Sequence, residues 1–384
     1  MRSTMERKNA LAEPIIPSAR AATRPRPRSA RAQLLRVGRL LAIWLGGGLL
    51  ALLVVAGAYT ALIAHNRADF NETIYENYRI VNLPQTTELF RHEGNGRTSY
   101  GENGLVVNKT VNFDVPRLLF VGDSYVEAKQ VSDPDKFTEL VESDWNAAHA
   151  DQPIQTLNMG LAGDDLRSYI SFGPNMDAAF APNIVFVMLK QQDLLTLIAD
   201  PAPLQQWQAD PTFRLAKPEK LSPIQQVISN TPFRQFFLRM LQQTQGFAPS
   251  DNSDAKTAQA ELNVSGDDML VGYEAEVAAQ LGALQRIWGD RLVIIYNANV
   301  PGIGEEAAPA FTEDTFVREA ARLGIPVVNI YEPMVAAFHN YQPPRGFQNS
   351  TLGVGHFNRT GHRIIADSLL TYLQQSGALA EVQR

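Results

Sequence analysis

The chain has no cysteine among its 384 residues. This absence excludes structural disulfides, thiolate metal sites and catalysis by a cysteine nucleophile. Its six histidines show no metal-ligand spacing, and no glycine-rich nucleotide or phosphate loop follows a predicted strand. We therefore expect neither a metal nor an organic cofactor. Catalysis, if the protein is an enzyme, must come from hydroxyl, carboxylate and imidazole groups.

Net charge is divided unevenly along the chain. Residues 1–39 carry ten Lys or Arg and two acids, a net charge of 10 − 2 = +8. The whole chain carries −6, so residues 40–384 carry −6 − 8 = −14. The Pro, Ala and Arg content of residues 1–39 predicts a disordered basic tail. The acidic remainder argues against a nucleic-acid partner.

Leu40–Ile63 is a run of 24 residues without a charge. As a helix it would reach roughly 36 Å, enough to span a bilayer. Trp44 and Tyr59 lie near its two ends, and the preceding arginines favour a cytoplasmic N-terminus. The alternative is a signal peptide cleaved near Ala56-Gly57-Ala58, but such peptides have apolar cores of only about 7–15 residues.

Residues 64–110 are polar and are interpreted as a stalk and entry segment with a turn cluster, Glu93-Gly94-Asn95-Gly96. Beyond them, strands and helices are expected to alternate. The predicted strands are 118–121, 154–158, 184–189, 292–296 and 326–330. The predicted helices are 133–148, 164–172, 269–288, 312–323 and 360–374. This order predicts a mainly parallel α/β sheet covered on both faces by helices. Residues 196–265 interrupt it and are interpreted as an insertion, either a lid over the site or a peripheral segment without a role there.

The tripeptide Gly122-Asp123-Ser124 directly follows the predicted strand 118–121. A serine there would project at the carboxyl edge of the sheet, where α/β folds bind ligands, although the same residue types also form ordinary turns. Three more short blocks follow in order. They are 158–164 (Asn-Met-Gly-Leu-Ala-Gly-Asp), Gln192-Asp193, and Gly355-His356 with Gly361-His362 before the last helix.

Together these four blocks resemble the SGNH/GDSL hydrolase family over about residues 115–375. The resemblance implies a flavodoxin-like three-layer α/β/α sandwich, which here would follow the transmembrane helix expected at Leu40–Ile63. It also implies that Ser124 is the nucleophile and His356 its base. The oxyanion hole would comprise the backbone N–H groups of Ser124 and Gly163, with Gly160 as the alternative glycine, and the amide of Gln192.

The sequence departs from the family pattern at two positions. Gln192 stands where the family has Asn, so the amide sits on a stem one methylene longer. Gly353 stands where the family has the Asp three residues before the histidine, and no carboxylate lies between Gln348 and His356. The ring must then be oriented by a backbone carbonyl, a water or a distant acid, and a Ser–His dyad is the default. Candidate acids are Asp123, Asp193 and Glu332.

Asp123, Asp193 and Asn158 are candidate supporting residues of the site. Asp123 and Asn158 also have local explanations, since Asp caps turns and Asn satisfies loop backbone. Their roles depend on contacts between segments, which the sequence does not specify.

The resemblance implies an acyl-ester hydrolase or O-acyltransferase that acts on an acylated glycan or a small ester. Family members with one N-terminal anchor are often tied to O-acetylation or deacetylation of cell-surface polysaccharides. We therefore expect a single-pass protein of the bacterial inner membrane, with a periplasmic catalytic domain and other envelope polysaccharide proteins as partners. Gln192 and Gly353 motivate an alternative, a catalytically reduced glycan-binding or scaffold module. A lipid esterase or thioesterase at the membrane surface is a third hypothesis.

Overall fold

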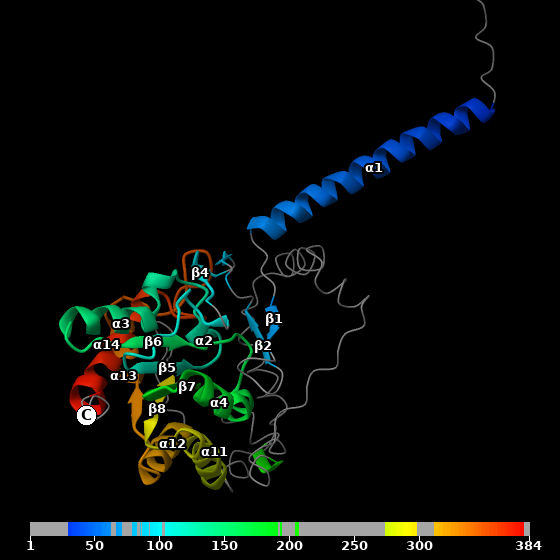
Figure 1. Cartoon of the computed structure of the whole chain (residues 1–384). Coiled ribbons are helices and arrows are strands. Elements are labelled where there is room, and N and C mark those ends of the chain that lie inside the picture. The colour runs from blue at the N-terminus through cyan, green and yellow to red at the C-terminus, as the bar shows by residue number, and fades with distance from the viewer. Residues whose placement is uncertain are drawn as a thin grey trace, which may run out of the picture. The chain divides into compact units, whose positions relative to one another are not determined.

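The computed structural model describes residues 30–62, 67–70, 79–82, 85, 87–91, 93–101, 104–190, 193, 204–206, 273–297 and 311–379 (Figure 1). The chain divides into two compact units, Met1–Val55 and Ala56–Arg384. Each is described by itself below. Of the predicted insertion at 196–265, only residues 204–206 belong to the described part, and they are helical.

The first unit contains most of one long helix, α1, which runs from Ala30 to Leu62. Its segment Gln33–Val55 has a mean hydropathy of 2.0, and none of its most apolar window is buried. The helix is long and apolar enough to cross a membrane, two criteria that a signal sequence also meets. It begins ten residues before the predicted run, because Ala30–Arg39 lacks proline and contains good helix formers.

The second unit is built on a five-stranded parallel sheet. Its strands are β5 (Arg117–Val121), β6 (Gln155–Asn158), β7 (Ile184–Lys190), β8 (Leu292–Asn297) and β9 (Val327–Asn329). They are ordered β6-β5-β7-β8-β9, which in chain order is 2-1-3-4-5, the flavodoxin-like order. The five predicted strands and the predicted α/β/α sandwich are therefore confirmed. The strand order reverses beside β5, so ligands are expected at the carboxyl end of this strand.

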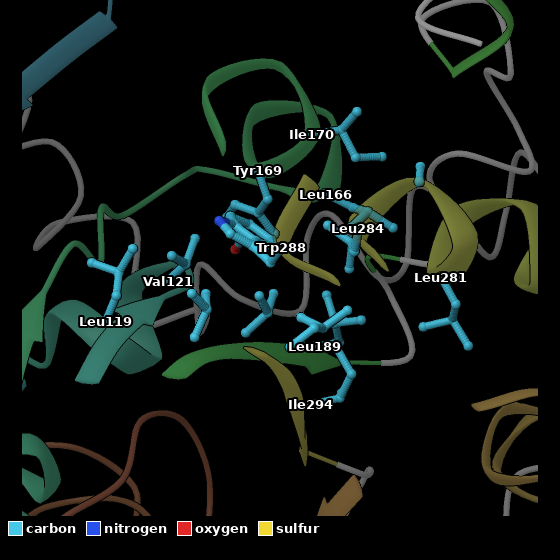
Figure 2. Close-up of a cluster of buried hydrophobic side chains, with 14 of the residues drawn as sticks. Leu119, Val121, Leu166, Tyr169, Ile170, Leu189, Leu281, Leu284, Trp288 and Ile294 are labelled. Atoms are coloured by element: carbon cyan, nitrogen blue, oxygen red, sulfur yellow. The ribbon is translucent and has the colours of Figure 1, made fainter. Parts of the chain in front are cut away.

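Helices cover both faces of the sheet. Leu119 and Val121 of β5 point into a core formed with α4 (Leu166–Phe180), α11 (Tyr273–Trp288) and α12 (Phe311–Arg322). Figure 2 shows part of this core, with Trp288 beside Tyr169 and Leu284. Leu118 and Phe120 alternate with them and point into the opposite core, formed with α3 (Phe137–Ala148), α13 (Tyr331–His339) and α14 (Arg359–Ser376).

Two predictions about helices were wrong. Helix α4 does not end at Gly173-Pro174 but continues through both residues to Phe180. It buries apolar side chains on both sides of the proline, including Ile170 and Met176, and this packing outweighs the backbone hydrogen bond that proline removes. Gly173 lets α4 approach α11 closely, since a Cβ there would lie 2.9 Å from Trp288. Helix α13, where no helix was predicted, follows β9 directly.

The segment between α1 and the sheet forms two antiparallel pairs. Strands β1 (Arg67–Phe70) and β2 (Arg79–Asn82) make one pair, and β3 (Thr87–Leu89) and β4 (Arg97–Ser99) make the other. The predicted turn cluster, residues 93–96, lies in the connection between β3 and β4. Just beyond β4, Val106 donates its N–H to the carbonyl of Asn158 at 2.9 Å, so this segment joins the edge of the sheet at β6.

Candidate active site

Ser124 lies at the carboxyl end of β5, where the strand order reverses. It is the first residue of α2 (Ser124–Glu127), a short helix capped by Asp123, whose Oδ1 accepts the N–H of Tyr125 at 2.9 Å. The turn requires glycine at 122, because a Cβ there would lie 2.3 Å from a methyl group of Val126. This geometry leaves the Ser124 side chain partly exposed at the edge of the sheet.

His356 faces Ser124 from the loop that precedes α14. Its Nε2 lies 2.8 Å from the Oγ of Ser124, within hydrogen-bond distance. The imidazole also packs against the ring of Tyr125, with 4.9 Å between ring centroids. The two residues matched to the family's nucleophile and base are thus brought together across 232 positions of the chain.

Glu93 lies on the far side of the same imidazole. Its Oε2 is 2.6 Å from Nδ1 of His356, and its Oε1 accepts the backbone N–H of His356 at 2.9 Å. The carboxylate therefore contacts both the ring and the backbone of the histidine. Ser124, His356 and Glu93 form a continuous hydrogen-bonded line, the arrangement of a serine-hydrolase triad.

Gly355 leaves the space that this carboxylate occupies. A Cβ on Gly355 would lie 2.2 Å from Oε1 of Glu93, and the residue has a φ of +89°. Gly353, where the family pattern has Asp, has a φ of +83° and so adopts a conformation that a side chain disfavours. On the other side, Asn349 accepts the N–H of Gly94 and donates to its carbonyl, both at 2.8 Å, which fixes the loop that carries Glu93.

None of the three acids considered from the sequence orients His356. Asp123 pairs with Lys190, with 2.6 Å from Oδ2 to Nζ, and caps α2. Asp193 accepts the backbone N–H of Lys190 at 3.0 Å, and burial raises the pKa of Asp193 to about 8. Glu332 is exposed in the first turn of α13. The sequence did signal a tight turn at 93–96, but not that its one carboxylate would reach the histidine.

The two candidate glycines of the second block have different environments. A Cβ on Gly160 would lie 2.2 Å from the backbone nitrogen of Glu127, so this glycine allows close packing against α2. Gly163 has a φ of +87°, and a Cβ there would meet no atom of the described residues within 4 Å. Asn158 supports this loop, since its Oδ1 accepts the N–H of Gly160 at 2.9 Å and its Nδ2 donates to the carbonyl of Val126 at 2.8 Å.

Two backbone donors beside Ser124 have no partner among the described residues. Within the described part of the chain, neither the N–H of Ser124 nor that of Gly163 has a hydrogen-bond acceptor. Ser124 is the first residue of its helix, so its N–H has no partner within the helix. Gln192, the third predicted donor, lies outside the described residues.

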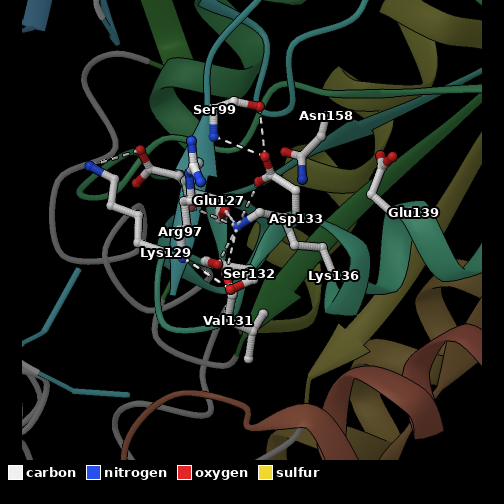
Figure 3. Close-up of polar contacts among 12 residues, drawn as sticks. Arg97, Ser99, Glu127, Lys129, Val131, Ser132, Asp133, Lys136, Glu139 and Asn158 are labelled. Carbon is white, nitrogen blue, oxygen red and sulfur yellow. Dashed lines mark hydrogen bonds and ion pairs between the residues drawn. The ribbon is translucent and has the colours of Figure 1, made fainter. Parts of the chain in front are cut away.

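A buried lysine ties the β3–β4 hairpin to the nucleophile turn (Figure 3). Lys136 has no exposed surface, and its ammonium donates to the Oγ1 of Thr98 in β4 at 3.0 Å. It also donates to the carbonyls of Glu127 at 3.2 Å, Val131 at 3.3 Å and Ala128, in and just after α2. Burial lowers the pKa of Lys136 to about 8.

A second lysine makes a similar connection. Lys129 Nζ lies 3.2 Å from a carboxylate oxygen of Glu88 in β3 and 3.1 Å from one of Glu127 in α2. Oε2 of Glu127 in turn accepts the N–H of Ala162 at 2.8 Å. The hairpin that carries Glu93, the helix that carries Ser124 and the loop that carries Gly163 are therefore joined by buried charged groups.

The comparisons with known proteins give matches in structure only. No family model and no curated protein matches the sequence. Similar solved structures include LAE5, an alpha/beta hydrolase enzyme from the metagenome of Lake Arreo, Spain, at 14% identity and a TM-score of 0.37, over 69% of this chain and 96% of that one. A lipase/acylhydrolase from Enterococcus faecalis matches at 11% identity and a TM-score of 0.36, over 68% of this chain and 97% of that one. The acetyl xylan esterase AlAXEase matches at 12% identity and a TM-score of 0.37, over 67% of this chain and 99% of that one.

The class of the protein follows from its own topology and site. It is a flavodoxin-like α/β sandwich with a Ser-His-Glu line at the carboxyl edge of its sheet, beside the reversal of strand order. Ser124 follows β5, Gly163 follows β6 and His356 precedes the last helix, in the order that the sequence blocks predicted. The topology thus confirms the flavodoxin-like α/β/α sandwich that the resemblance to SGNH/GDSL hydrolases implied.

Proposed function

We propose that the protein is a serine-dependent acyl-ester hydrolase or O-acyltransferase. The observation that carries this proposal is the line from Ser124 Oγ through His356 to Glu93, with distances of 2.8 and 2.6 Å. An alcohol becomes an effective nucleophile only beside a base, and a neutral imidazole serves as that base near neutral pH. A carboxylate behind the ring completes the set of groups that acyl transfer needs.

In the proposed reaction, Ser124 attacks the carbonyl carbon of an ester while Nε2 of His356 takes the hydroxyl proton. Glu93 holds the proton of the imidazole on Nδ1, which directs the lone pair of Nε2 at Ser124, and it stabilises the imidazolium that forms. The contact between Glu93 and the backbone N–H of His356 limits rotation of the carboxylate. His356 then gives the proton to the departing alcohol, and an acyl-serine remains.

The oxyanion of the tetrahedral intermediate needs donors that already point toward it. The unpaired N–H groups of Ser124 and Gly163 supply two of them in this proposal. The open space beside Gly163 supports this role, since substrate could approach the backbone there without meeting a side chain. The resemblance assigns the third donor to Gln192.

The acyl-serine is then attacked by water, which gives hydrolysis, or by a sugar hydroxyl, which gives transfer. We infer an acetyl ester of a cell-envelope polysaccharide as the substrate. In this assignment α1 anchors the protein in the bacterial inner membrane with its arginine-rich end in the cytoplasm, and the sheet unit lies in the periplasm. Other envelope polysaccharide proteins would then supply or use the acylated glycan.

Hydrolysis of 4-nitrophenyl acetate by the full chain in detergent micelles tests the proposal, together with labelling by a fluorophosphonate probe. We expect wild-type protein to turn over the ester and to be labelled, and Ser124→Ala to do neither. Ser368→Ala, which alters a serine whose hydroxyl donates to the carbonyl of Ile364 in α14, is the matched control and should behave as wild type. Equal turnover by wild type and Ser124→Ala, with no labelling of either, would contradict the proposal.

A further inference from the structure

Two cationic side chains lie over the ring of Tyr125, the residue that follows the nucleophile. Lys190 Nζ is 5.5 Å and Arg345 Cζ is 5.4 Å from the centroid of this ring. Because the same ring packs on the imidazole of His356, both cations are close to the reacting groups. Lys190 and Asn297 are opposite each other at the ends of β7 and β8, so the cluster lies at the carboxyl edge of the sheet.

The two cations differ in how their charge is compensated. Lys190 is paired with the carboxylate of Asp123 at 2.6 Å. Within the described part of the chain, Arg345 contacts only neutral groups: Nη2 donates to Oδ1 of Asn297 at 2.6 Å, and Nη1 donates to the hydroxyl of Tyr125 at 3.3 Å. No carboxylate of the described residues is within ion-pair distance of Arg345.

The guanidinium of Arg345 is also held in one orientation. Its Cζ lies 4.7 Å above the ring of Phe357, in addition to its contact with Tyr125. Its Nε is buried and has no hydrogen-bond acceptor among the residues that the structure describes. A buried donor without a partner is costly, more so when it belongs to a charged group, so each such group in a native structure calls for an explanation.

A fixed guanidinium with unused donors is suited to one kind of partner. Arginine binds planar carboxylates through paired N–H groups, and this binding is strongest where the guanidinium is already oriented. The neutral contacts of Arg345 orient its charge without cancelling it. An anion brought by the substrate would supply the missing compensation.

We infer that Arg345 binds a carboxylate on the molecule that carries the ester, so that the preferred substrate is an acylated acidic glycan containing uronic acid. This inference rests on the proposed function and narrows its substrate class. The acyl group would react at Ser124 while a carboxylate of the same glycan pairs with Arg345 across the ring of Tyr125. A neutral acetylated glycan would react at the same serine without this contact.

The test compares acetate release from acetylated polygalacturonate and from acetylated xylan, using the full chain in detergent micelles. Wild type should show the higher kcat/KM on the acidic polymer. Arg345→Gln should lower the ratio of the two kcat/KM values about tenfold, as loss of one charge-assisted hydrogen bond predicts. Arg345→Lys, which keeps the charge but not the paired donors, should give an intermediate ratio. Arg322→Gln removes an exposed cation that pairs with Glu319 in α12, and should leave the ratio unchanged.

A binding measurement separates the glycan contact from catalysis. Ser124→Ala should bind de-acetylated oligogalacturonate in calorimetry, and Ser124→Ala/Arg345→Gln should bind it about tenfold more weakly. Inorganic phosphate and sulfate at matched ionic strength should not compete with the oligogalacturonate. Equal competition by phosphate would overturn the carboxylate assignment.

The outcomes for the two proposals are distinct. Turnover of both polymers with the same ratio in wild type and Arg345→Gln would overturn the acidic-glycan inference and leave the esterase proposal standing. Absence of turnover on every ester, together with no fluorophosphonate labelling, would refute the proposed function itself. Labelling of Ser124 at the wild-type rate in Arg345→Gln shows that the site has formed. If that variant does not fold, the polymer preference of wild type and its competition by oligogalacturonate decide the question.

Discussion

Replacing Glu93 by Gln tests the triad most directly. The carboxylate accepts two hydrogen bonds, one from Nδ1–H of His356 at 2.6 Å and one from the backbone N–H of the same residue at 2.9 Å. A glutamine of the same shape has only one acceptor oxygen. One of the two donors must therefore face an amide NH2 group, whichever way the amide is turned.

Each orientation of the amide has a defined cost. If its oxygen faces Nδ1, the backbone N–H of His356 loses its acceptor, which costs about 1–3 kcal/mol of stability. If its NH2 group faces Nδ1, the ring must carry its proton on Nε2 and can no longer accept the proton of Ser124. In serine-hydrolase triads the corresponding acid-to-amide change lowers kcat about 10⁴-fold. We expect a loss of roughly 10³- to 10⁴-fold in Glu93→Gln, about 4–5.5 kcal/mol in the activation free energy.

The assay is steady-state hydrolysis of 4-nitrophenyl acetate by the full chain in detergent, with thermal unfolding measured on the same samples. Glu332→Gln makes the same chemical change at an exposed acid and should keep wild-type kcat. Gly355→Ala approaches the same site from its other side, since its methyl group would lie 2.2 Å from Oε1 of Glu93. It should displace the carboxylate and lower kcat to a similar extent.

One result would refute this reasoning. If Glu93→Gln folds like wild type and keeps kcat within tenfold of it, Glu93 does not set the tautomer of the histidine. A large loss in Gly355→Ala alone would then report backbone strain at a φ of +89° instead of displacement of the acid.

Three further predictions follow from the site and its supports. Gly163→Ala should lower kcat about 10- to 100-fold and destabilise by about 1–2 kcal/mol, because its φ of +87° disfavours a side chain, whereas Gly160→Ala should destabilise by about 1–3 kcal/mol, because its methyl group would overlap the backbone of α2. Burial lowers the pKa of His362 to about 3, so below its unfolded pKa of about 6.5 only the unfolded state takes up the proton. The free energy of unfolding of wild type should therefore fall by about 2 kcal/mol between pH 6.5 and pH 5, and this loss should be absent in His362→Asn. Lys136→Met should cost about 3–5 kcal/mol, since its buried carbonyl partners lose a charged donor, and Thr98→Val only about 1.

Each of these predictions has its own contradicting result. Equal kcat in Gly163→Ala and wild type would exclude a tightly positioned N–H at that residue. A parallel loss of stability with falling pH in wild type and His362→Asn would assign the acid sensitivity to other groups. Wild-type stability in Lys136→Met would mean that the hairpin is fixed without this lysine. Thermal and denaturant unfolding measure the stability changes. Ester hydrolysis measures the change in kcat of Gly163→Ala.

The sheet could be predicted from the sequence because its strands are short apolar runs bounded by polar residues. Leu118–Val121 and Ile184–Leu189 are buried on both faces, and a continuous apolar run is the expected pattern for such strands. Helix α4 was mispredicted because local rules give weight to Gly173-Pro174. They do not include the tertiary packing of Phe180 and Met176, which carries the helix beyond the proline.

The same difference, between local sequence patterns and tertiary packing, explains which residues of the site could be predicted. Ser124 and His356 could be predicted because each belongs to a short block whose neighbours define it. Glu93 could not, because its partner lies 263 positions away and the intervening chain gives no register between them. The missing acid at Gly353 was recognised from the sequence, but its replacement depended on how a hairpin packs.

The position of Glu93 changes what the missing Asp at Gly353 implies. A glycine there indicated a Ser–His dyad and motivated the hypothesis of a reduced, glycan-binding module. The structure instead leaves space at Gly355 for a carboxylate and fills it from the β3–β4 hairpin, so that one of the two motives for the reduced module no longer applies. The proposed nucleophile and base lie at the carboxyl edge of the sheet, in α2 and in the loop before α14, but the proposed acid comes from the segment that joins the sheet to α1. Activity should therefore depend on the docking of this hairpin, which Lys136 and the Asn349 contacts with its loop secure.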